Sequence, residues 1–292
     1  MKLGIVAHRT REDIGGIVTN IANLISSSGF KVSVHEQLRS KMDEGAAYIF
    51  CDEKTLGTTS DLLVSIGGDG TMLSAAMIGH TYDKPLVGIN FGKLGFLADV
   101  DVNKLADFLA ELQKGEYKVE ERMVLESECS QAPGEIHVAF NDFVIDKGYW
   151  PKMIDIRLEV DGEYVTTFPA DGVVFATPTG STGYSLSVGG PIVTQKAEVI
   201  TIAPISPHSL TARPLVLSPY QRVKITTISE HKTIQFNADG QRVVDYASPA
   251  EIHISRCRKS LKILRTHSSS YFQVLRNKLF WGLDVRNSQI KI

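Results

Sequence analysis

The sequence has few cysteines, no long apolar run and no excess of charge of one sign. Its three cysteines, Cys51, Cys129 and Cys257, lie too far apart for a disulfide framework or a zinc knuckle. No stretch approaches the ~20 apolar residues of a membrane span, and residues 2–7 are typical of a strand and not of a signal peptide. The formal net charge of −2 gives no overall attraction to nucleic acid or to an anionic membrane. We therefore expect a cytoplasmic protein without nucleic-acid or membrane partners, which binds any phosphate through local geometry.

The first part of the chain alternates short apolar runs with segments of helical periodicity. Apolar runs at residues 3–7, 62–66 and 85–90 are typical of buried strands, and apolar residues recur at helical spacing between residues 14 and 25. Such alternation indicates a parallel sheet flanked by helices. We expect an α/β nucleotide-binding domain over residues 1–121.

After about Gly115 the helical periodicity gives way to short strand candidates. Turn signals such as Asp161-Gly162 and Asp239-Gly240 separate these candidates, so we expect a mostly β, sandwich-like domain over residues 122–265. Helical periodicity returns at residues 271–280. Because a lone helix needs an apolar surface to cover, we expect the tail, residues 266–292, to pack back on the first domain.

A glycine-rich turn follows one of the predicted buried strands. The segment Ser65-Ile-Gly67-Gly68-Asp69-Gly70-Thr71 places three glycines and one carboxylate between this strand and a predicted helix. In open α/β sheets ligands bind at this edge, and the start of a helix attracts anions. The pattern is neither a Walker loop nor a Rossmann fingerprint. A carboxylate repels phosphate, so Asp69 is a candidate proton acceptor or metal contact, although a helix cap in a tight turn is an equally simple interpretation.

A second glycine-rich segment combines hydroxyl groups with an aromatic ring and has no charge. It runs Thr177-Pro-Thr-Gly-Ser-Thr-Gly-Tyr-Ser-Leu-Ser187 and follows a predicted strand. Hydroxyls and exposed amides suit ribose, phosphate or carboxamide groups, while Tyr184 is suited to stack on a base or to pack in the core. The two glycine-rich segments together predict a nucleotide site.

Together these segments resemble NAD kinases. Gly67-Gly-Asp-Gly70 matches a signature that NAD kinases share with diacylglycerol kinases and phosphofructokinases, whereas Asn141-Asp142 and residues 177–187 are similar to motifs specific to the NAD kinase family. Asp239-Gly-Gln241 is a further match. Residues 90–96 and 275–281 match as well, and the matches follow the expected order over nearly the whole chain.

The resemblance implies transfer of a phosphoryl group from ATP to the adenosine 2′-hydroxyl of NAD, giving NADP and ADP. It implies that Asp69 is the general base, that Asn141 and Asp142 bind ribose hydroxyls, and that Tyr184 lies against the adenine. The full set of implied substrate contacts is Gly67, Gly68, Gly70, Thr71, Phe96, Asn141, Asp142, Lys152, Asp171, Thr182, Gly183, Tyr184, Ser185, Leu186, Ser187 and Gln241. A need for Mg²⁺ and a homo-oligomer, a dimer or tetramer, are also implied, but no metal ligand is assigned.

The chain departs from the family pattern at three positions. Asp142 stands where relatives commonly carry Glu, Gly183 stands where they carry Ala, and Pro169 replaces a residue that is charged in many of them. Two alternatives stay open. One is a kinase of the same superfamily acting on a lipid or a sugar phosphate, although we find no basic amphipathic helix for a membrane, and the second glycine-rich segment has no arginine for a second phosphate. The other is a non-catalytic NAD-binding regulator.

Overall fold

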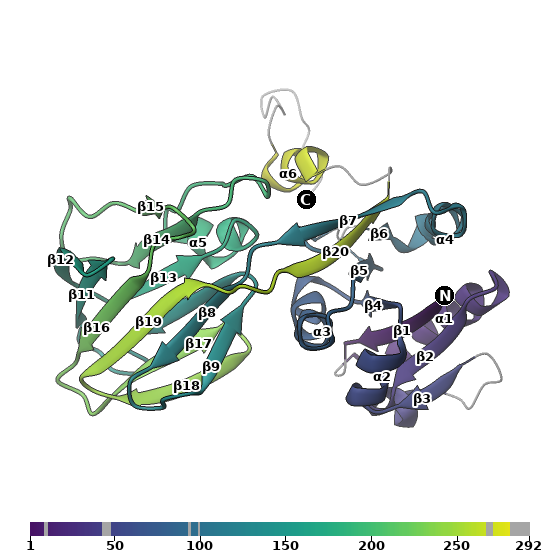
Figure 1. The fold of residues 1–292 in the computed structure, drawn as a ribbon, viewed down its shortest axis with the longest axis horizontal. Helices are drawn as coiled ribbons and strands as arrows, with labels where there is room; N and C mark the ends of the chain where they lie inside the picture. The colour runs from purple at the N-terminus through teal and green to yellow at the C-terminus, as the bar shows by residue number, and fades with distance from the viewer. Residues whose placement is uncertain (9–10, 43–47, 93–94, 99, 267–270, 281–292) are drawn as a thin grey trace. The chain divides into compact units, whose positions relative to one another are not determined.

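The computed structural model divides into two compact units (Figure 1). It describes residues 1–8, 11–42, 48–92, 95–98, 100–266 and 271–280, so that Lys93 and Trp281, which fall in the family-like segments, lie outside the described residues. One unit comprises Met1–Glu121 and Lys262–Ile292, and the other comprises Arg122–Leu261. The chain thus returns to the first unit at Lys262, a little earlier than the predicted position at residue 266.

The first unit contains an eight-stranded sheet with the order β3-β2-β1-β4-β5-β20-β7, and β6 pairs with β5. The strands are β1 (Lys2–Ala7), β2 (Lys31–His35), β3 (Ile49–Cys51), β4 (Leu62–Ile66), β5 (Leu86–Asn90), β6 (Val100–Asp101), β7 (Tyr117–Arg122) and β20 (Leu261–Thr266). The pairings among β1 to β5, and those of β6 and β20 with β5, are parallel. The predicted α/β fold of this part is confirmed.

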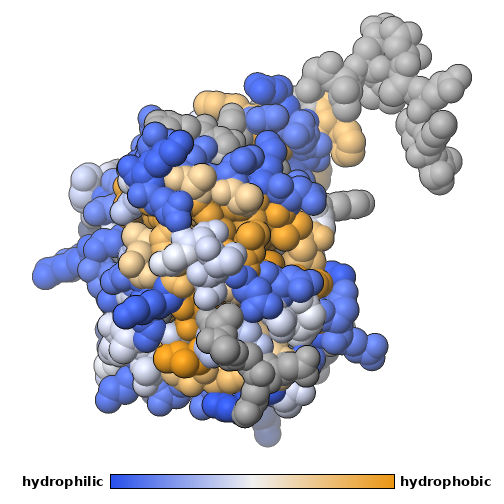
Figure 2. All heavy atoms as spheres, turned by 90° about the vertical axis from the view of Figure 1, so that its right-hand side faces the viewer, coloured by the Kyte–Doolittle hydropathy of each residue, from blue (hydrophilic) through white to orange (hydrophobic). Residues whose placement is uncertain are grey.

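Central strands of this sheet are buried along their whole length. All five residues of β4 and all five of β5 are buried, which explains why both strands are almost continuously apolar. The accompanying helices are α1 (Ile14–Ser27), η1 (Glu36–Lys41), α2 (Glu53–Thr59), α3 (Asp69–Tyr82), η2 (Val102–Lys104), α4 (Leu105–Lys114) and α6 (Tyr271–Leu279). Among the described residues, no helix is long and apolar enough to cross a membrane. Figure 2 shows the surface of the first unit, on which apolar areas are interspersed with hydrophilic side chains.

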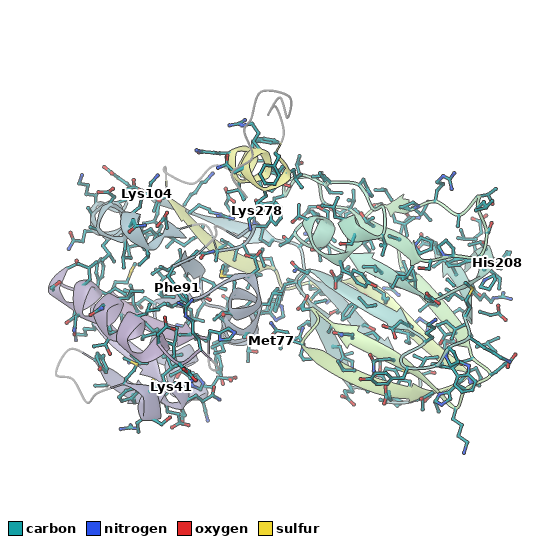
Figure 3. All side chains as sticks on the ribbon, turned by 180° about the vertical axis from the view of Figure 1, so that it is seen from behind. Lys41, Met77, Phe91, Lys104, His208 and Lys278 are labelled. Atoms are coloured by element: carbon teal, nitrogen blue, oxygen red, sulfur yellow. The ribbon has the colours of Figure 1, made fainter. Side chains whose placement is uncertain are left out.

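The last described helix, α6, belongs to the first unit. Its buried side chains are Val274 and Leu275, whereas Phe272 is 57% exposed. Lys278, labelled in Figure 3, places its Nζ atom 5.7 Å from the centre of the Phe96 ring. The helix α6 therefore packs on the first unit through a narrow apolar face and one cation–π contact.

We expect Leu275→Ala to lower the free energy of unfolding of the first unit by about 2–5 kcal/mol, because it leaves a cavity where Leu275 is 1% exposed. Phe272→Ala, on the exposed side of the same helix, should change it by less than about 0.5 kcal/mol. Scanning calorimetry of both variants checks this expectation. Equal melting curves for Leu275→Ala and the unmodified protein would mean that α6 contributes nothing to the stability of the unit.

The second unit is a sandwich of two six-stranded sheets with the orders β15-β14-β13-β10-β17-β18 and β12-β11-β16-β19-β8-β9. The strands are β8 (Leu125–Cys129), β9 (Ile136–Ala139), β10 (Asp142–Asp146), β11 (Ile154–Val160), β12 (Glu163–Ala170), β13 (Gly172–Ala176), β14 (Ile200–Ile205), β15 (Leu215–Leu217), β16 (Val223–Ile228), β17 (Thr233–Ala238), β18 (Arg242–Ala247) and β19 (Ala250–Arg256). One apolar cluster takes Phe143, Phe175 and Phe236 from the first sheet and Ile225 and Ile252 from the second. The predicted sandwich-like domain is therefore confirmed.

The outer face of the sheet that contains β10 carries the hydroxyl-rich segment. Phe143 and Ile145 of β10 point into the sandwich core, so Val144 lies on the opposite face, where it joins a small apolar cluster with Val174 and Ile205. After β13 the chain forms two short helices, η3 (Gly180–Thr182) and α5 (Tyr184–Ser187). The polar ends of β10, Asp142 and Asp146, flank Val144 on this face.

Candidate active site

The glycine-rich turn connects the end of β4 to the start of α3, as the sequence predicts. Gly67 is buried against Thr71, and a Cβ atom added at Gly67 would lie 2.3 Å from the Thr71 Oγ1 atom. Gly68 and Gly70 are exposed, and an added Cβ at Gly68 would meet nothing within 4 Å. The Thr71 Oγ1 atom is buried and has no hydrogen-bond partner among the described residues. The turn therefore presents an open backbone edge at the start of a helix, which suits a phosphate.

Asp69 is held by backbone amides from the segment after β5. Its Oδ2 atom accepts the Phe96 N–H at 3.0 Å, and its Oδ1 atom accepts the N–H groups of Leu97 at 3.0 Å and Ala98 at 3.2 Å. A carboxylate offers about four lone-pair sites, so one site on Oδ2 remains for another donor. Gly68 is the N-cap of α3 and the helix has no side-chain cap bond in the described chain, so Asp69 is not a helix cap.

A pocket of about 300 Å³ lies in the second unit and brings together distant parts of the chain. Its lining comes from β10, from α5, and from β17 with the turn that follows it. The lining residues are Asn141, Asp142, Val144, Asp146, Tyr184, Asn237, Asp239 and Gly240. Asn141, Asp142 and Tyr184, which the resemblance selects, thus share one pocket.

Asp239 organises the backbone at the start of β10. Its carboxylate accepts hydrogen bonds from the backbone N–H groups of Phe140, Asn141 and Asp142, with shortest N–O distances of 2.9, 2.7 and 3.3 Å. It also forms an ion pair with Arg242 at 2.7 Å. Burial raises the pKa of Asp239, whereas these amides and the guanidinium oppose the rise. The sequence marked Asp239 only through a turn and a family motif, because its partners lie about one hundred residues earlier in the chain.

The other carboxyl groups of the pocket have raised pKa values. Burial raises the pKa of Asp142 to about 7, Asp239 adds to the rise, and the Tyr184 N–H opposes it. Burial is also the main cause of the raised pKa of Asp146, and Asp171 adds to it. The Tyr184 phenol has a raised pKa because of burial and of the three carboxylates Asp146, Asp171 and Asp142. The side of the pocket around Tyr184 is therefore acidic.

Several hydroxyls of the second glycine-rich segment hold the segment itself. Thr177 donates to the Phe140 carbonyl at 2.6 Å, Ser181 donates to the Pro178 carbonyl at 2.7 Å, and Thr182 donates to the Thr179 carbonyl at 3.3 Å. Ser185 differs, since its buried Oγ atom has no partner among the described residues. Gly180 packs so closely that an added Cβ would lie 2.0 Å from the Asn141 carbonyl oxygen. The segment is therefore locked onto the start of β10.

The remaining candidate residues do not line this pocket. Lys152 is exposed and forms an ion pair with Glu230 at 2.5 Å, and Asp171 forms an ion pair with Lys147 at 2.6 Å. The other candidate residues of the second unit that do not line the pocket are Thr182, Gly183, Ser185, Leu186, Ser187 and Gln241. Gln241 is nevertheless adjacent to the lining residue Gly240.

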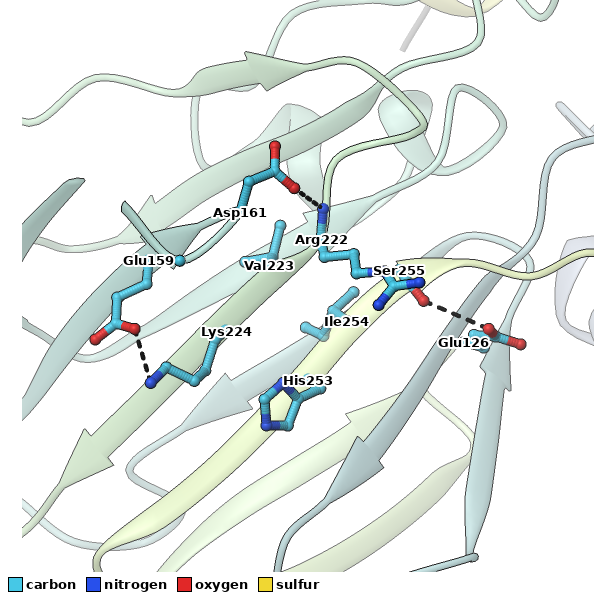
Figure 4. Close-up of a pocket in the computed structure, with 10 residues that line it drawn as sticks. Glu126, Glu159, Asp161, Arg222, Val223, Lys224, His253, Ile254 and Ser255 are labelled. Atoms are coloured by element: carbon cyan, nitrogen blue, oxygen red, sulfur yellow. Dashed lines mark hydrogen bonds and ion pairs between the residues drawn. The ribbon is translucent and has the colours of Figure 1, made fainter. Parts of the chain in front are cut away.

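A larger hollow of about 750 Å³ lies over the other sheet of the second unit (Figure 4). Two of its charged groups already have partners, since Lys224 pairs with Glu159 at 2.7 Å and Glu126 accepts a hydrogen bond from Ser255 at 3.4 Å. None of the candidate residues lines it. The chemistry that the sequence predicts is therefore not located in this hollow. In the described part of the chain, no group of three or more His, Cys, Asp or Glu side chains is placed to hold a metal ion.

The chain is similar to known proteins along nearly its whole length. Models of the ATP-NAD kinase N-terminal domain and of the ATP-NAD kinase C-terminal domain match residues 3–117 and 140–266. A protein of Thiobacillus denitrificans named NAD kinase is 42% identical over 230 residues, which cover 78% of this chain and 79% of that protein. One of Laribacter hongkongensis, also named NAD kinase, is 35% identical over 96% of this chain and 97% of its own length.

Two solved structures share the fold. Yeast NADH kinase complexed with NADH superposes with a TM-score of 0.87 at 24% identity, covering 99% of this chain and 90% of that one. An NAD kinase from Archaeoglobus fulgidus in complex with ATP gives a TM-score of 0.74 at 27% identity, with coverages of 96% and 99%. The chain therefore belongs to the NAD kinase family, and its activity is that of a phosphotransferase.

Proposed function

We propose that the chain phosphorylates the adenosine 2′-hydroxyl of NAD with ATP, giving NADP and ADP. The observation that carries this proposal is the Asp69 carboxylate, which three amides hold in a glycine-rich turn and which keeps one accepting site free. The names of the relatives and the ATP complex of the Archaeoglobus fulgidus structure support the choice of substrates. As a family member, the chain is further proposed to act in the cytoplasm as a homo-oligomer.

In the proposed mechanism Asp69 accepts the proton of the 2′-hydroxyl while the 2′-oxygen of the ribose attacks the γ-phosphorus of ATP. A new O–P bond forms, the bond to the β,γ-bridging oxygen breaks, and ADP leaves with the electron pair. The exposed turn at Gly68 and Gly70 and the start of α3 stabilise the charge on the transferring group. Because amides fix the carboxylate, little reorganisation is needed during the transfer.

The turn also fits a magnesium ion bound together with the triphosphate. Mg²⁺ usually takes one or two carboxylates plus substrate phosphates and water rather than an all-protein cage. Asp69 has one free lone-pair site, so it would hold the ion only as an alternative to accepting the proton. With Asp69 as the base, the substrate phosphates and water beside the turn would hold the ion, which would supply neutralising charge to the phosphates. The chain itself still positions the hydroxyl and accepts its proton.

The pocket lined by Asn141, Asp142 and Tyr184 is proposed to hold a nucleoside half of NAD. Its acidic side suits ribose hydroxyls, which donate hydrogen bonds to carboxylates. Tyr184 is 45% exposed, so its ring is accessible for stacking on a base, and Thr182 to Ser187 are proposed to contact the adenine side. Asp171 is proposed to lie near the nicotinamide end.

An assay for NADP tests the proposed function. The purified protein is incubated with NAD, ATP and Mg²⁺, and NADP is detected with an NADP-specific dehydrogenase. NADH and inorganic polyphosphate, tested in place of NAD and ATP, define the acceptor and the donor. Binding of NAD without formation of NADP would favour a regulator, and transfer to a lipid or a sugar phosphate instead would contradict the proposal.

Asp142 should give NAD binding a pH dependence near neutrality. With a pKa of about 7 this carboxyl is largely neutral at pH 6 and ionised at pH 8, and the ionised form accepts hydrogen bonds from ribose hydroxyls more strongly than the neutral form does. We expect NAD affinity, measured by calorimetry, to rise with pH over this interval, and Asp142→Asn to flatten the dependence. An identical pH profile in the variant would contradict this role.

Ionisation of Asp142 should lower the stability of the fold, whereas it should raise the affinity for NAD. The folded protein keeps the Asp142 proton up to a pH of about 7, whereas the unfolded chain releases it near the ordinary value of 3.8. The free energy of unfolding should therefore fall between these two pH values as pH rises. Asp142→Asn removes this loss, so the variant should melt at a higher temperature than the unmodified protein at pH 8.

A further inference from the structure

Asn237 places an amide on the outer face of the sheet that carries the pocket. It lies on β17, where its Cα atom pairs with Val144 of β10. Its neighbours Phe236 and Ala238 belong to the sandwich core, so the Asn237 side chain points to the opposite face. There it lines the pocket of about 300 Å³ together with Asp142 and Tyr184.

The amide oxygen of Asn237 is buried without a hydrogen bond. Neither it nor the amide oxygen of Asn141, which lines the same pocket, has a partner among the described residues. A buried acceptor without a donor destabilises a fold. An apolar side chain at position 237 would instead extend the cluster around Val144. The fold therefore gives no reason for an amide here, whereas a ligand that donates a hydrogen bond does.

The groups around the pocket define the chemistry of that ligand. Besides the two amides, the lining has the carboxyls of Asp142 and Asp146 and the phenol of Tyr184. Asp146 accepts the Gly148 N–H at 2.7 Å and Asp142 accepts the Tyr184 N–H, and a carboxylate with one such bond keeps further accepting sites. Arg242 and Lys147, the cations that act on the pocket carboxyls Asp239 and Asp146, are already paired, Arg242 with Asp239 at 2.7 Å and Lys147 with Asp171 at 2.6 Å. Such a pocket accepts O–H and N–H donors and repels phosphate. Its volume lies at the lower limit for ligand sites, which suits one nucleoside rather than the whole dinucleotide.

We propose that Asn237 is a substrate-binding residue, whose amide oxygen accepts a hydrogen bond from the nucleoside half of NAD that enters this pocket. This inference rests on the proposed function and adds to it a contact that no motif indicated. The donor is a ribose hydroxyl or an amino or carboxamide N–H of that half. Selectivity follows because a nucleoside analogue without this donor would leave the buried oxygen unsatisfied.

Calorimetry on the full chain with Asn237→Leu tests the proposal. The dissociation constant for NAD should rise about three- to tenfold, the range expected for one lost hydrogen bond, while that for ATP stays unchanged. The melting temperature should be equal or higher, because an unsatisfied amide is replaced by an apolar group. Gln235→Leu is the matched control, since Gln235 lies two residues earlier on β17, on the same face, and does not line the pocket. NAD affinity should be unchanged in this control.

AMP and nicotinamide mononucleotide, titrated separately, identify the half of NAD involved, because only its affinity should fall in the variant. An NAD affinity within twofold of the unmodified protein would overturn the assignment, and so would a clearly lower melting temperature of Asn237→Leu. Should this variant not fold, Asn237→Ala serves the same comparison. Formation of NADP by the unmodified protein, assayed in parallel, separates failure of this inference from failure of the proposed function.

Discussion

Asp69→Asn should reduce kcat by roughly 10²-fold or more while NAD affinity changes little. Asn has nearly the shape of Asp but cannot accept the hydroxyl proton. ATP binding should hold or tighten, because a negative charge beside the phosphates is removed. The substitution also has a structural cost, since a side-chain NH₂ group replaces one oxygen that receives backbone N–H groups of the segment 96–98. An N–H group left without an acceptor should lower the free energy of unfolding by about 1–3 kcal/mol.

Steady-state kinetics at several Mg²⁺ concentrations, with a melting curve for each protein, distinguish the possible roles of Asp69. A general base gives a low kcat that added Mg²⁺ does not restore. A metal contact gives a loss that raised Mg²⁺ partly rescues. A purely structural role gives a lowered melting temperature with kcat near that of the unmodified protein, and this result would exclude Asp69 as the base.

Most of the correct sequence predictions rest on patterns of residues that are neighbours in the chain. The glycine turn at Gly67 to Gly70 is encoded by neighbouring residues, so its position between β4 and α3 followed from the apolar run before it and the helical pattern after it. The alternation of strands and helices likewise predicted the α/β fold. The roles of single residues in the site remain predictions, since they rest on resemblance and on geometry.

The features that the sequence could not predict depend on contacts between residues far apart in the chain. The apolar run of β20 has no feature that says which sheet it joins, and it pairs with β5, more than one hundred and seventy residues earlier. The amides of Leu97 and Ala98 bind Asp69, but backbone donors leave no trace in residue type. Only the resemblance of residues 90–96 to the family pointed to this segment. Asn237 lies in an ordinary alternating strand pattern, and only the pocket distinguishes it from a solvent-facing amide.

Gly95→Ala should lower kcat nearly as much as Asp69→Asn, although it replaces none of the candidate residues. A Cβ atom added at Gly95 would lie 2.0 Å from the Asp69 Oδ1 atom and 2.8 Å from its Cγ atom. The carboxylate or the segment that holds it must therefore move. Since a displacement of about 1 Å in a reacting group can cost roughly 10²-fold in rate, we expect a loss of that order in kcat. Binding of NAD to the pocket of the second unit should be unchanged.

Gly92→Ala is the matched control for Gly95→Ala. It lies three residues earlier, and among the described residues its added Cβ would meet only the Asn90 Oδ1 atom, at an ordinary distance of 3.7 Å. Its kcat should stay within about twofold of the unmodified value, as for a substitution that meets no close contact. The decisive comparison is the double variant Asp69→Asn with Gly95→Ala. If Gly95→Ala acts by displacing the carboxylate, it should cost little further activity once that carboxylate is gone. If the loss of kcat in the double variant instead equals the product of the two single losses, Gly95 affects the site independently of Asp69.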